Sequence, residues 1–212
     1  MDSENQIDKL IIAPHADDEV LGCGGILDKA TFVYYCGLDE SEVQPDPTYR
    51  VPLKERVEEI KRVSNFFGFK YEINYKTKVN NYKITELISA FEAIINKLKP
   101  NKIFIPFPSY NQDHKVVYDA VQVALRPHDK NFFVKKVLVY EQDQAIIWEH
   151  KNFKINYFVP IDVEKKIEGY LLHASQVRKM RSPELLRVIA KLRGFQSNYE
   201  HAEAFTVERW VE

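Results

Sequence analysis

A chain of 212 residues is long enough for one ordinary domain, because a domain of this size buries roughly 70% of the surface that the unfolded chain would expose. Lysine and arginine (30) balance aspartate and glutamate (31), and the net charge is -1. This balance excludes the broad basic field that attracts nucleic acid or an anionic membrane. We therefore expect no nucleic-acid partner.

The first ten residues, MDSENQIDKL, lack the basic start and long apolar stretch of a secretory signal. No later run approaches the roughly 18 apolar residues of a membrane span. The only cysteines, Cys23 and Cys36, form no C-x-x-C pair, which fits a reducing compartment. The sequence therefore predicts a cytoplasmic protein without a transmembrane segment.

Short β-rich runs alternate along the chain with segments of helical periodicity. The expected strands are residues 9–14, 31–37, 71–76, 102–107 and 136–142, and the expected helices are 52–67, 84–98, 115–125 and two more after residue 162. This alternation predicts an α/β fold with a mostly parallel sheet covered by helices, whose ligand site lies beyond the carboxyl ends of the strands. Without a repeat or a flexible linker, we expect a single domain over residues 1–212.

A long polar loop, residues 38–52, follows the second expected strand. It contains prolines and has no periodicity, and loops of this length in a compact domain are often functional. It falls at the same edge of the expected sheet as residues 15–19, which follow the first expected strand. We interpret it either as a solvated excursion or as one wall of a pocket.

One histidine and three acids, His15 and residues 17–19, follow directly on the first expected strand. Acids in a first helical turn stabilise the helix dipole by about 0.3 to 1 kcal/mol each, but capping does not call for His15. If a helix begins near His15, that side chain and Asp18 lie one turn apart and can face the same point. Asp17 then lies beside them, turned away from Asp18.

These residue types suit a catalytic zinc site, which takes three protein ligands and leaves a fourth position for water. His15 and Asp18 supply two ligands. The candidate for the third is His114, which follows an acid between the fourth expected strand and the next helix. The remaining histidines, which have no such setting, are His128, His150, His173 and His201.

The same ligand types also suit ferrous iron, and His15-x-Asp17 can be read as the first pair of an iron oxygenase triad. Those oxygenases build the triad on an antiparallel barrel, whereas this chain alternates strand and helix. We therefore favour hydrolysis over oxidation.

The segment PHADDEVLGCGG, residues 14–25, resembles the signature of the PIG-L/LmbE-like N-acetylglucosaminyl deacetylases. Further similarities cover most of the chain: Arg56 and Glu59 in one helix, NQDH at 111–114, HASQ at 173–176 and EAF at 203–205. The resemblance implies a Rossmann-like α/β fold with zinc at the strand ends.

By position, the resemblance implies that His15, Asp18 and His114 bind zinc and that Asp17 is the general base. It also implies a supporting role for Asp113 next to the site and a substrate-binding role for Arg56. An ion pair with Glu59 explains Arg56 equally well. Tyr110, which precedes the NQDH segment, is a candidate for stacking on a sugar.

The chain departs from the family pattern at Asn111, where the family usually has a histidine that is thought to help stabilise the transition state. An amide can still donate a hydrogen bond to an oxyanion, and such a donor can be worth about 3 kcal/mol. It cannot supply the positive charge of an imidazolium. The replacement therefore puts the efficiency of catalysis in question.

The leading hypothesis is a zinc-dependent hydrolase that removes the acetyl group from a small N-acetylglucosamine-type amino-sugar conjugate. A metal-bound water attacks the amide, and Asp17 acts as general base. The alternative is a catalytically impaired member of the same fold that only binds metal or glycan; the intact Asp17 argues against it. The glycines at 22, 24 and 25 lack the G-x-G-x-x-G spacing, which argues against nucleotide binding. The sequence leaves open the sugar, the aglycone, the metal used in the cell and whether chains form a homo-oligomer.

Overall fold

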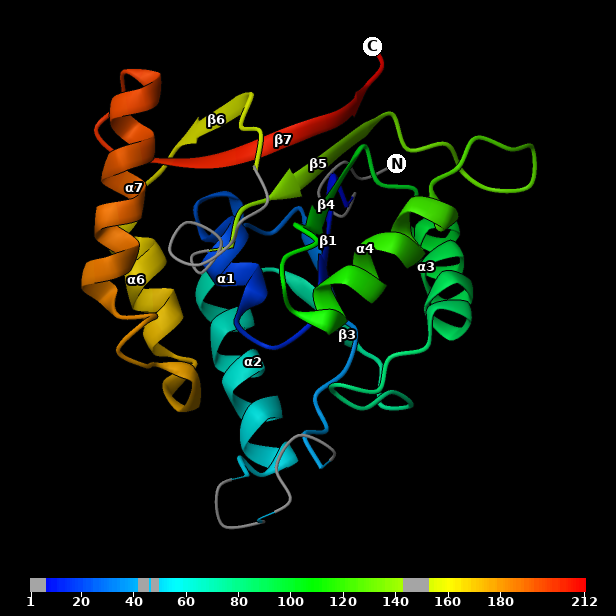
Figure 1. Cartoon of the computed structure of the whole chain (residues 1–212), viewed down its shortest axis with the longest axis horizontal. Helices are drawn as coiled ribbons and strands as arrows, with labels where there is room; N and C mark the ends of the chain where they lie inside the picture. The colour runs from blue at the N-terminus through cyan, green and yellow to red at the C-terminus, as the bar shows by residue number, and fades with distance from the viewer. Residues whose placement is uncertain (1–6, 42–45, 47–49, 143–152) are drawn as a thin grey trace.

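The computed structural model describes residues 7–41, 46, 50–142 and 153–212. Within them, seven strands form one sheet in the order β3-β2-β1-β4-β5-β7-β6 (Figure 1). The strands are β1 (Lys9–Ala13), β2 (Thr31–Tyr35), β3 (Lys70–Ile73), β4 (Lys102–Pro106), β5 (Lys136–Tyr140), β6 (Tyr157–Pro160) and β7 (Ala202–Trp210). Strands β1 to β5 are parallel, and β7 runs antiparallel to both β5 and β6. The predicted α/β fold with a mostly parallel sheet is confirmed.

Helices cover both faces of the sheet (Figure 1). The α-helices are α1 (Asp18–Cys23), α2 (Leu53–Phe67), α3 (Ile84–Leu98), α4 (Gln112–Ala124), α6 (Val163–Leu171) and α7 (Pro183–Ser197). Helices α3 and α4 lie against one face, and α1, α2, α6 and α7 lie against the other.

The two faces of β1 each bury apolar side chains, as a central parallel strand requires. Leu10 and Ile12 pack toward α3 and α4, whereas Ile11 and Ala13 belong to the core under α2, α6 and α7. Successive residues of a strand point to opposite faces, and helices cover both faces here, so all four side chains are fully buried. The strand is therefore fixed from both sides, and so is the point at which it ends, directly before Pro14.

The helix boundaries agree with the sequence prediction for α2 and α3 but not for α1 and α4. Helix α2 begins after Pro52 and ends at Gly68, whose φ of 87° is the left-handed conformation that glycine adopts readily. Helix α3 has the predicted bounds. Helix α4 starts at Gln112, three residues earlier than predicted, because Asn111 caps it. Helix α1 starts at Asp18, not near His15, so this expectation was wrong.

The sequence did not predict the antiparallel strands β6 and β7. Strand β7 is formed by the aromatic-rich C-terminal segment. Its Phe205 is fully buried against Phe104 in the core, and the strand pairs with both β5 and β6. The tail therefore completes the sheet.

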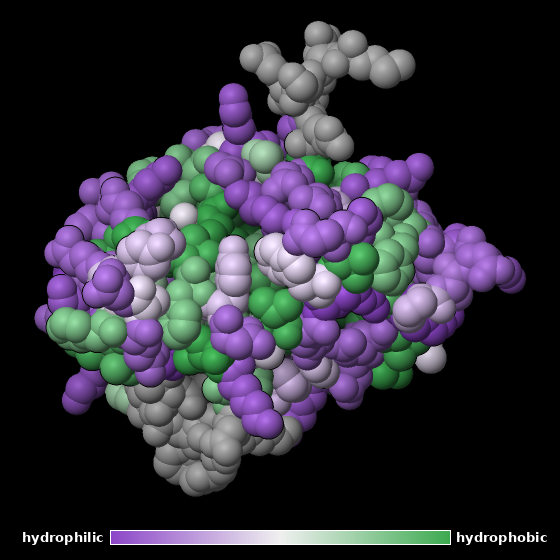
Figure 2. All heavy atoms as spheres, turned by 90° about the horizontal axis from the view of Figure 1, so that it is seen from above, coloured by the Kyte–Doolittle hydropathy of each residue, from purple (hydrophilic) through white to green (hydrophobic). Residues whose placement is uncertain are grey.

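Seen from above, the surface mixes hydrophobic and hydrophilic side chains (Figure 2). Among the described residues, no helix is long and apolar enough to cross a membrane. Cys23 and Cys36 are both buried and unpaired. The 38–52 loop lies partly outside the described residues, and His150 lies entirely outside them.

Candidate active site

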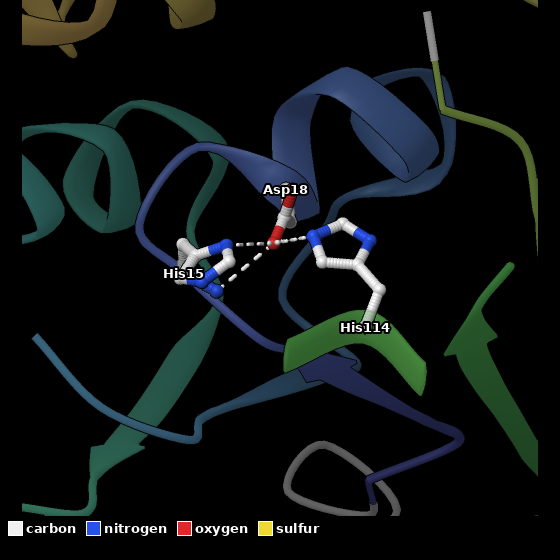
Figure 3. A group of neighbouring side chains, drawn as sticks. All are labelled: His15, Asp18 and His114. Atoms are coloured by element: carbon white, nitrogen blue, oxygen red, sulfur yellow. Dashed lines mark hydrogen bonds and ion pairs between the residues drawn. The ribbon is translucent and has the colours of Figure 1, made fainter. Parts of the chain in front are cut away.

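His15, Asp18 and His114 meet at the carboxyl ends of β1 and β4. His15 follows β1, Asp18 is the first residue of α1, and His114 lies in the first turn of α4. Figure 3 shows both imidazole rings pointing at one carboxylate oxygen of Asp18. Although α1 starts later than predicted, the backbone N–H of His15 donates to the same oxygen at 2.9 Å and brings the two residues together.

The two distances from Asp18 to the histidine nitrogens match those between the ligands of a tetrahedral metal. Asp18 Oδ2 lies 3.3 Å from His15 Nδ1 and 3.4 Å from His114 Nε2. Ligand atoms about 2.0–2.1 Å from zinc, arranged tetrahedrally, lie about 3.3 Å from one another. Within the described part of the chain, this group of ligands could hold a metal, and its ligand atoms all lie within 4.8 Å of one another.

Asp113 holds the ring of His15. Its Oδ2 lies 2.9 Å from His15 Nε2 and also accepts a hydrogen bond from the backbone N–H of Asn80 at 2.8 Å. Asp113 is the kind of carboxylate partner that fixes the orientation of a metal-binding histidine. The sequence had left open which side chain Asp113 supports, and the structure identifies His15.

His15 and Asp18 shift each other's pKa. Burial lowers the pKa of His15, but hydrogen bonds to Asp113 and Asp18 outweigh it and raise that pKa to about 10. Burial raises the pKa of Asp18, yet the nearby His114 and His15 hold it well below its ordinary value. In the absence of metal, the site is therefore an ionised carboxylate facing a protonated His15, and a cation entering it must displace a proton.

Asp17, the expected general base, has an unusual backbone. Its φ of 120° is rare for a residue with a side chain, and such conformations cost about 1–3 kcal/mol. Its carbonyl accepts hydrogen bonds from the N–H groups of Val20 and Leu21 and so starts α1. Its own N–H donates to Glu19 Oε2 at 3.0 Å. Asp17 therefore begins α1 in a strained turn that the side chain of Glu19 holds.

The carboxylate of Asp17 is 1% exposed and accepts a hydrogen bond from Arg181 Nη1 at 2.7 Å. Burial raises the pKa of Asp17, and the positive charge of Arg181 opposes this shift; the net pKa lies above its ordinary value. Asp17 is thus a better proton acceptor than an exposed aspartate.

The segment from His173 to Arg181 also reaches this site, although no site role was predicted for it. His173 Nε2 lies 2.6 Å from Glu19 Oε1, with both side chains fully buried. The backbone N–H and the hydroxyl of Ser175 donate to the two carboxylate oxygens of Glu59 at 2.8 and 2.7 Å. The similarity at 173–176 was the available signal for His173 and Ser175, whereas nothing in the sequence pointed to Arg181.

Asn111 is used as a helix cap. Its Oδ1 accepts a hydrogen bond from the N–H of Asp113 at 2.8 Å, which is the usual role of asparagine at the start of a helix. The amide nitrogen of Asn111, which is its side-chain donor, remains available to donate to a substrate oxygen.

Arg56 is 3% exposed and forms an ion pair with Glu40, at the start of the 38–52 loop, not with Glu59. Its Nε and Nη1 are buried without a hydrogen-bond partner among the described residues. Burying guanidinium donors without partners costs free energy, and a ligand that accepts hydrogen bonds from them would remove this cost. The described ends of the loop line a pocket of about 160 Å³. Tyr110, between β4 and α4, is 45% exposed.

Fold and site together define an α/β protein with three side chains that could hold a metal and a buried carboxylate at the strand ends. The family model described as PIG-L, GlcNAc-PI de-N-acetylase, matches residues 10–125, which is more than half of the chain. The chain therefore belongs to the PIG-L family, a family of N-deacetylases. No curated protein matches the chain in a sequence search.

Solved structures share this fold over nearly the whole chain. The conserved protein TT1542 from Thermus thermophilus is 20% identical, with a TM-score of 0.75 over 98% of this chain and 97% of that one. The N,N'-diacetylchitobiose deacetylase from Pyrococcus horikoshii is 20% identical, with a TM-score of 0.72 over 96% and 84%. GalB, the 4-carboxy-2-hydroxymuconate hydratase from Pseudomonas putida, is 16% identical, with a TM-score of 0.76 over 97% and 98%. Since these names include a hydratase, the fold alone does not decide the reaction.

Proposed function

We propose that the protein is a zinc-dependent deacetylase of an N-acetylglucosamine-type conjugate, with His15, Asp18 and His114 as the zinc ligands. The observation that carries this proposal is the grouping of these three side chains, with zinc-like distances from Asp18 to both histidines, next in the chain to the buried carboxylate of Asp17. Membership of the PIG-L family supports the reaction, and the similar fold of an N,N'-diacetylchitobiose deacetylase supports the substrate class.

The ligand set fits zinc, and it admits ferrous iron as a second metal. A bound zinc ion would lower the pKa of a water molecule toward about 7 and polarise the acetamide carbonyl. Asp113 would keep the His15 ring in place, with Nε2 directed at its carboxylate and Nδ1 left for the metal. Hydrolysis requires no change of metal oxidation state, which favours zinc for this reaction.

Asp17 acts as the proton acceptor and donor. Arg181 occupies its Oδ2, so Oδ1 is the oxygen that accepts the proton from the attacking water. Its raised pKa strengthens it as a base, and after the tetrahedral stage it returns the proton to the leaving amine. The products are acetate and a free amino sugar.

Substrate contacts are assigned to residues around this centre. The amide nitrogen of Asn111 donates to the developing oxyanion in place of an imidazolium. Arg56 binds polar groups of the conjugate with its Nε and Nη1, which have no hydrogen-bond partner in the described part of the chain. Tyr110, which is exposed at the rim, packs on the sugar ring.

A second candidate function is a member of the family that binds the metal and the sugar without efficient turnover. The observation that favours it is the use of Asn111 Oδ1 as a helix cap, because this ties down the side chain that replaces the usual histidine. Binding of an N-acetylated conjugate without acetate release would identify this case.

Acetate release from a panel of N-acetylglucosamine conjugates tests the proposal. We expect the zinc-loaded wild type to release acetate and Asp17→Asn to be slower by about 10²–10⁴-fold, with zinc retained. Asp119→Asn is the matched control, since Asp119 is exposed on the same helix as His114. Full activity of Asp17→Asn would rule out Asp17 as the base.

A further inference from the structure

The left-handed backbone of Asp17 needs contacts that hold it. Its φ of 120° places the N–H toward the side chain of Glu19, two residues further along. That N–H donates to Glu19 Oε2, and Asp17 is almost completely buried. The conformation of the base therefore depends on where Glu19 places its carboxylate.

Glu19 joins Asp17 to His173. Its Oε2 accepts the N–H of Asp17 at 3.0 Å, and its Oε1 lies 2.6 Å from His173 Nε2. Glu19 is completely buried and lies in the first turn of a short helix. If one partner is removed, water cannot replace the lost hydrogen bond. The imidazole donates from Nε2 both as the neutral tautomer and as the imidazolium, so this contact does not depend on a change of protonation.

His173 is itself held rigidly. Its N–H donates to the carbonyl of Tyr170 at the end of α6, and its carbonyl accepts from Gln176. Two residues further on, Ser175 makes the two hydrogen bonds to Glu59. The backbone at His173 is therefore held between α6 and α2, and its fully buried ring, whose Nε2 faces Glu19, has little room to move.

We propose that His173 is a positioning residue: through Glu19 it holds the backbone of Asp17 in the left-handed conformation that directs the Asp17 carboxylate away from the zinc ligand Asp18 and toward Arg181. The proposal rests on the function of Asp17 proposed above. His173 lies outside residues 10–125, the part of the chain matched by the family model. It touches neither the metal ligands nor the substrate in this role.

Two substitutions of similar chemistry separate positioning from general stability. His173→Gln places an amide N–H near the position of Nε2, whereas the shorter side chain of His173→Asn does not reach it. With both variants loaded with zinc, we expect kcat to fall roughly 100-fold in His173→Asn, since a displacement of about 1 Å can cost that much. We expect His173→Gln to recover kcat to within about 10-fold, and KM to change little in either.

Hydrogen exchange of the Asp17 amide, followed by NMR, tests the same contact without a substrate. We expect exchange to be about 10-fold faster in His173→Asn and close to wild type in His173→Gln. Glu19→Gln, which keeps the size of the side chain, should also speed this exchange and serves if His173→Asn does not fold. The matched control is His128→Asn, a histidine between α4 and β5 at the opposite edge of the sheet.

Each outcome decides one proposal. Wild-type kcat and wild-type Asp17 exchange in His173→Asn would overturn the positioning role. Equal loss of kcat in both amide variants, with Asp17 exchange unchanged, would overturn it as well. If the wild type releases no acetate from any conjugate, the proposed function fails, while the exchange rates still decide whether His173 holds Asp17.

Discussion

Asp17 is held at three points, by the start of α1, by Glu19 and by Arg181. The first two fix its backbone, and the third fixes one oxygen of its carboxylate. A carboxylate that is buried but ion-paired on one side keeps a defined orientation for its other oxygen. At the scale of single residues, the geometry of the proposed base therefore depends on its neighbours in α1 and on one distant residue, Arg181, 164 positions away.

Removing Arg181 should change the pH dependence of the reaction. Burial raises the pKa of Asp17 and Arg181 opposes this, so Arg181→Ala should raise the pKa further. Because the base must be ionised, activity on the acid side should then be lost at higher pH than in the wild type. The acid limb of kcat/KM against pH measures the shift.

Arg181→Lys keeps the positive charge and should shift the acid limb less than Arg181→Ala does. Arg187→Ala removes an arginine from an exposed ion pair with Glu164 and should leave the profile unchanged. An acid limb that stays in place in Arg181→Ala would show that Arg181 does not act on the base.

Zinc binding should release about one proton from His15 at pH 7. The pKa of His15 is raised to about 10 without metal, so the ring is protonated at this pH and must become neutral to bind zinc. An ordinary histidine with a pKa of about 6.5 would release only about a quarter of a proton. Calorimetric titrations in two buffers of different ionisation enthalpy give the number of protons released.

Zinc affinity should accordingly rise with pH between about 7 and 9, because the competing proton is lost as the pH approaches the pKa of His15. Asp113→Asn should weaken zinc binding by roughly 10–100-fold, since it removes the carboxylate that orients His15. Release of only about a quarter of a proton per zinc ion, with a zinc affinity that does not change with pH, would contradict the charge state described for this site.

At the scale of elements, α1 can carry Asp18 into the site because it lies close to β5. A Cβ at Gly22 would lie 2.2 Å from the ring of Tyr140, which is fully buried and donates a hydrogen bond from its hydroxyl to Ile12 O at 2.8 Å. Glycine at position 22 therefore lets the helix pack on a ring that is held at the end of β1.

Gly22→Ala should destabilise the protein. Replacing glycine by alanine in a helix stabilises it by up to about 1 kcal/mol, but overpacking against a fixed ring typically destabilises a protein by about 1–3 kcal/mol. We expect a net loss of about 1 kcal/mol or more and a Tm lower by about 2–4 °C per kcal/mol, measured by calorimetry. Val188→Ala, at an exposed position of α7, is the control and should change the stability by less than about 0.5 kcal/mol. An unchanged Tm in Gly22→Ala would show that α1 can shift freely.

At the scale of the whole molecule, the sequence predicted what is local and periodic. Strands β1 to β5 and helices α2 and α3 have strong patterns, and the first two proposed zinc ligands are neighbours in one motif. His114 could be placed because parallel strands bring their carboxyl ends to one edge of the sheet. The fold class and the family resemblance are confirmed.

The rest depends on contacts between distant parts of the chain. His173 meets Glu19 across 154 positions, and Arg181 meets Asp17 across 164, and no periodic pattern encodes such pairs. Strands β6 and β7 exist because β5 offers an edge for pairing, which local propensity does not reveal. Helix α4 starts earlier than predicted because Asn111 caps it ahead of its periodic apolar positions.

The most direct test of the central claim is the dependence of acetate release on added zinc, measured with protein first stripped of metal by a chelator. We predict that activity rises in proportion to zinc and levels off at one zinc ion per chain, and that His114→Ala, which lacks one ligand of the triad, gives no such rise. Acetate release that is the same without zinc, or that is retained in His114→Ala, would contradict the account.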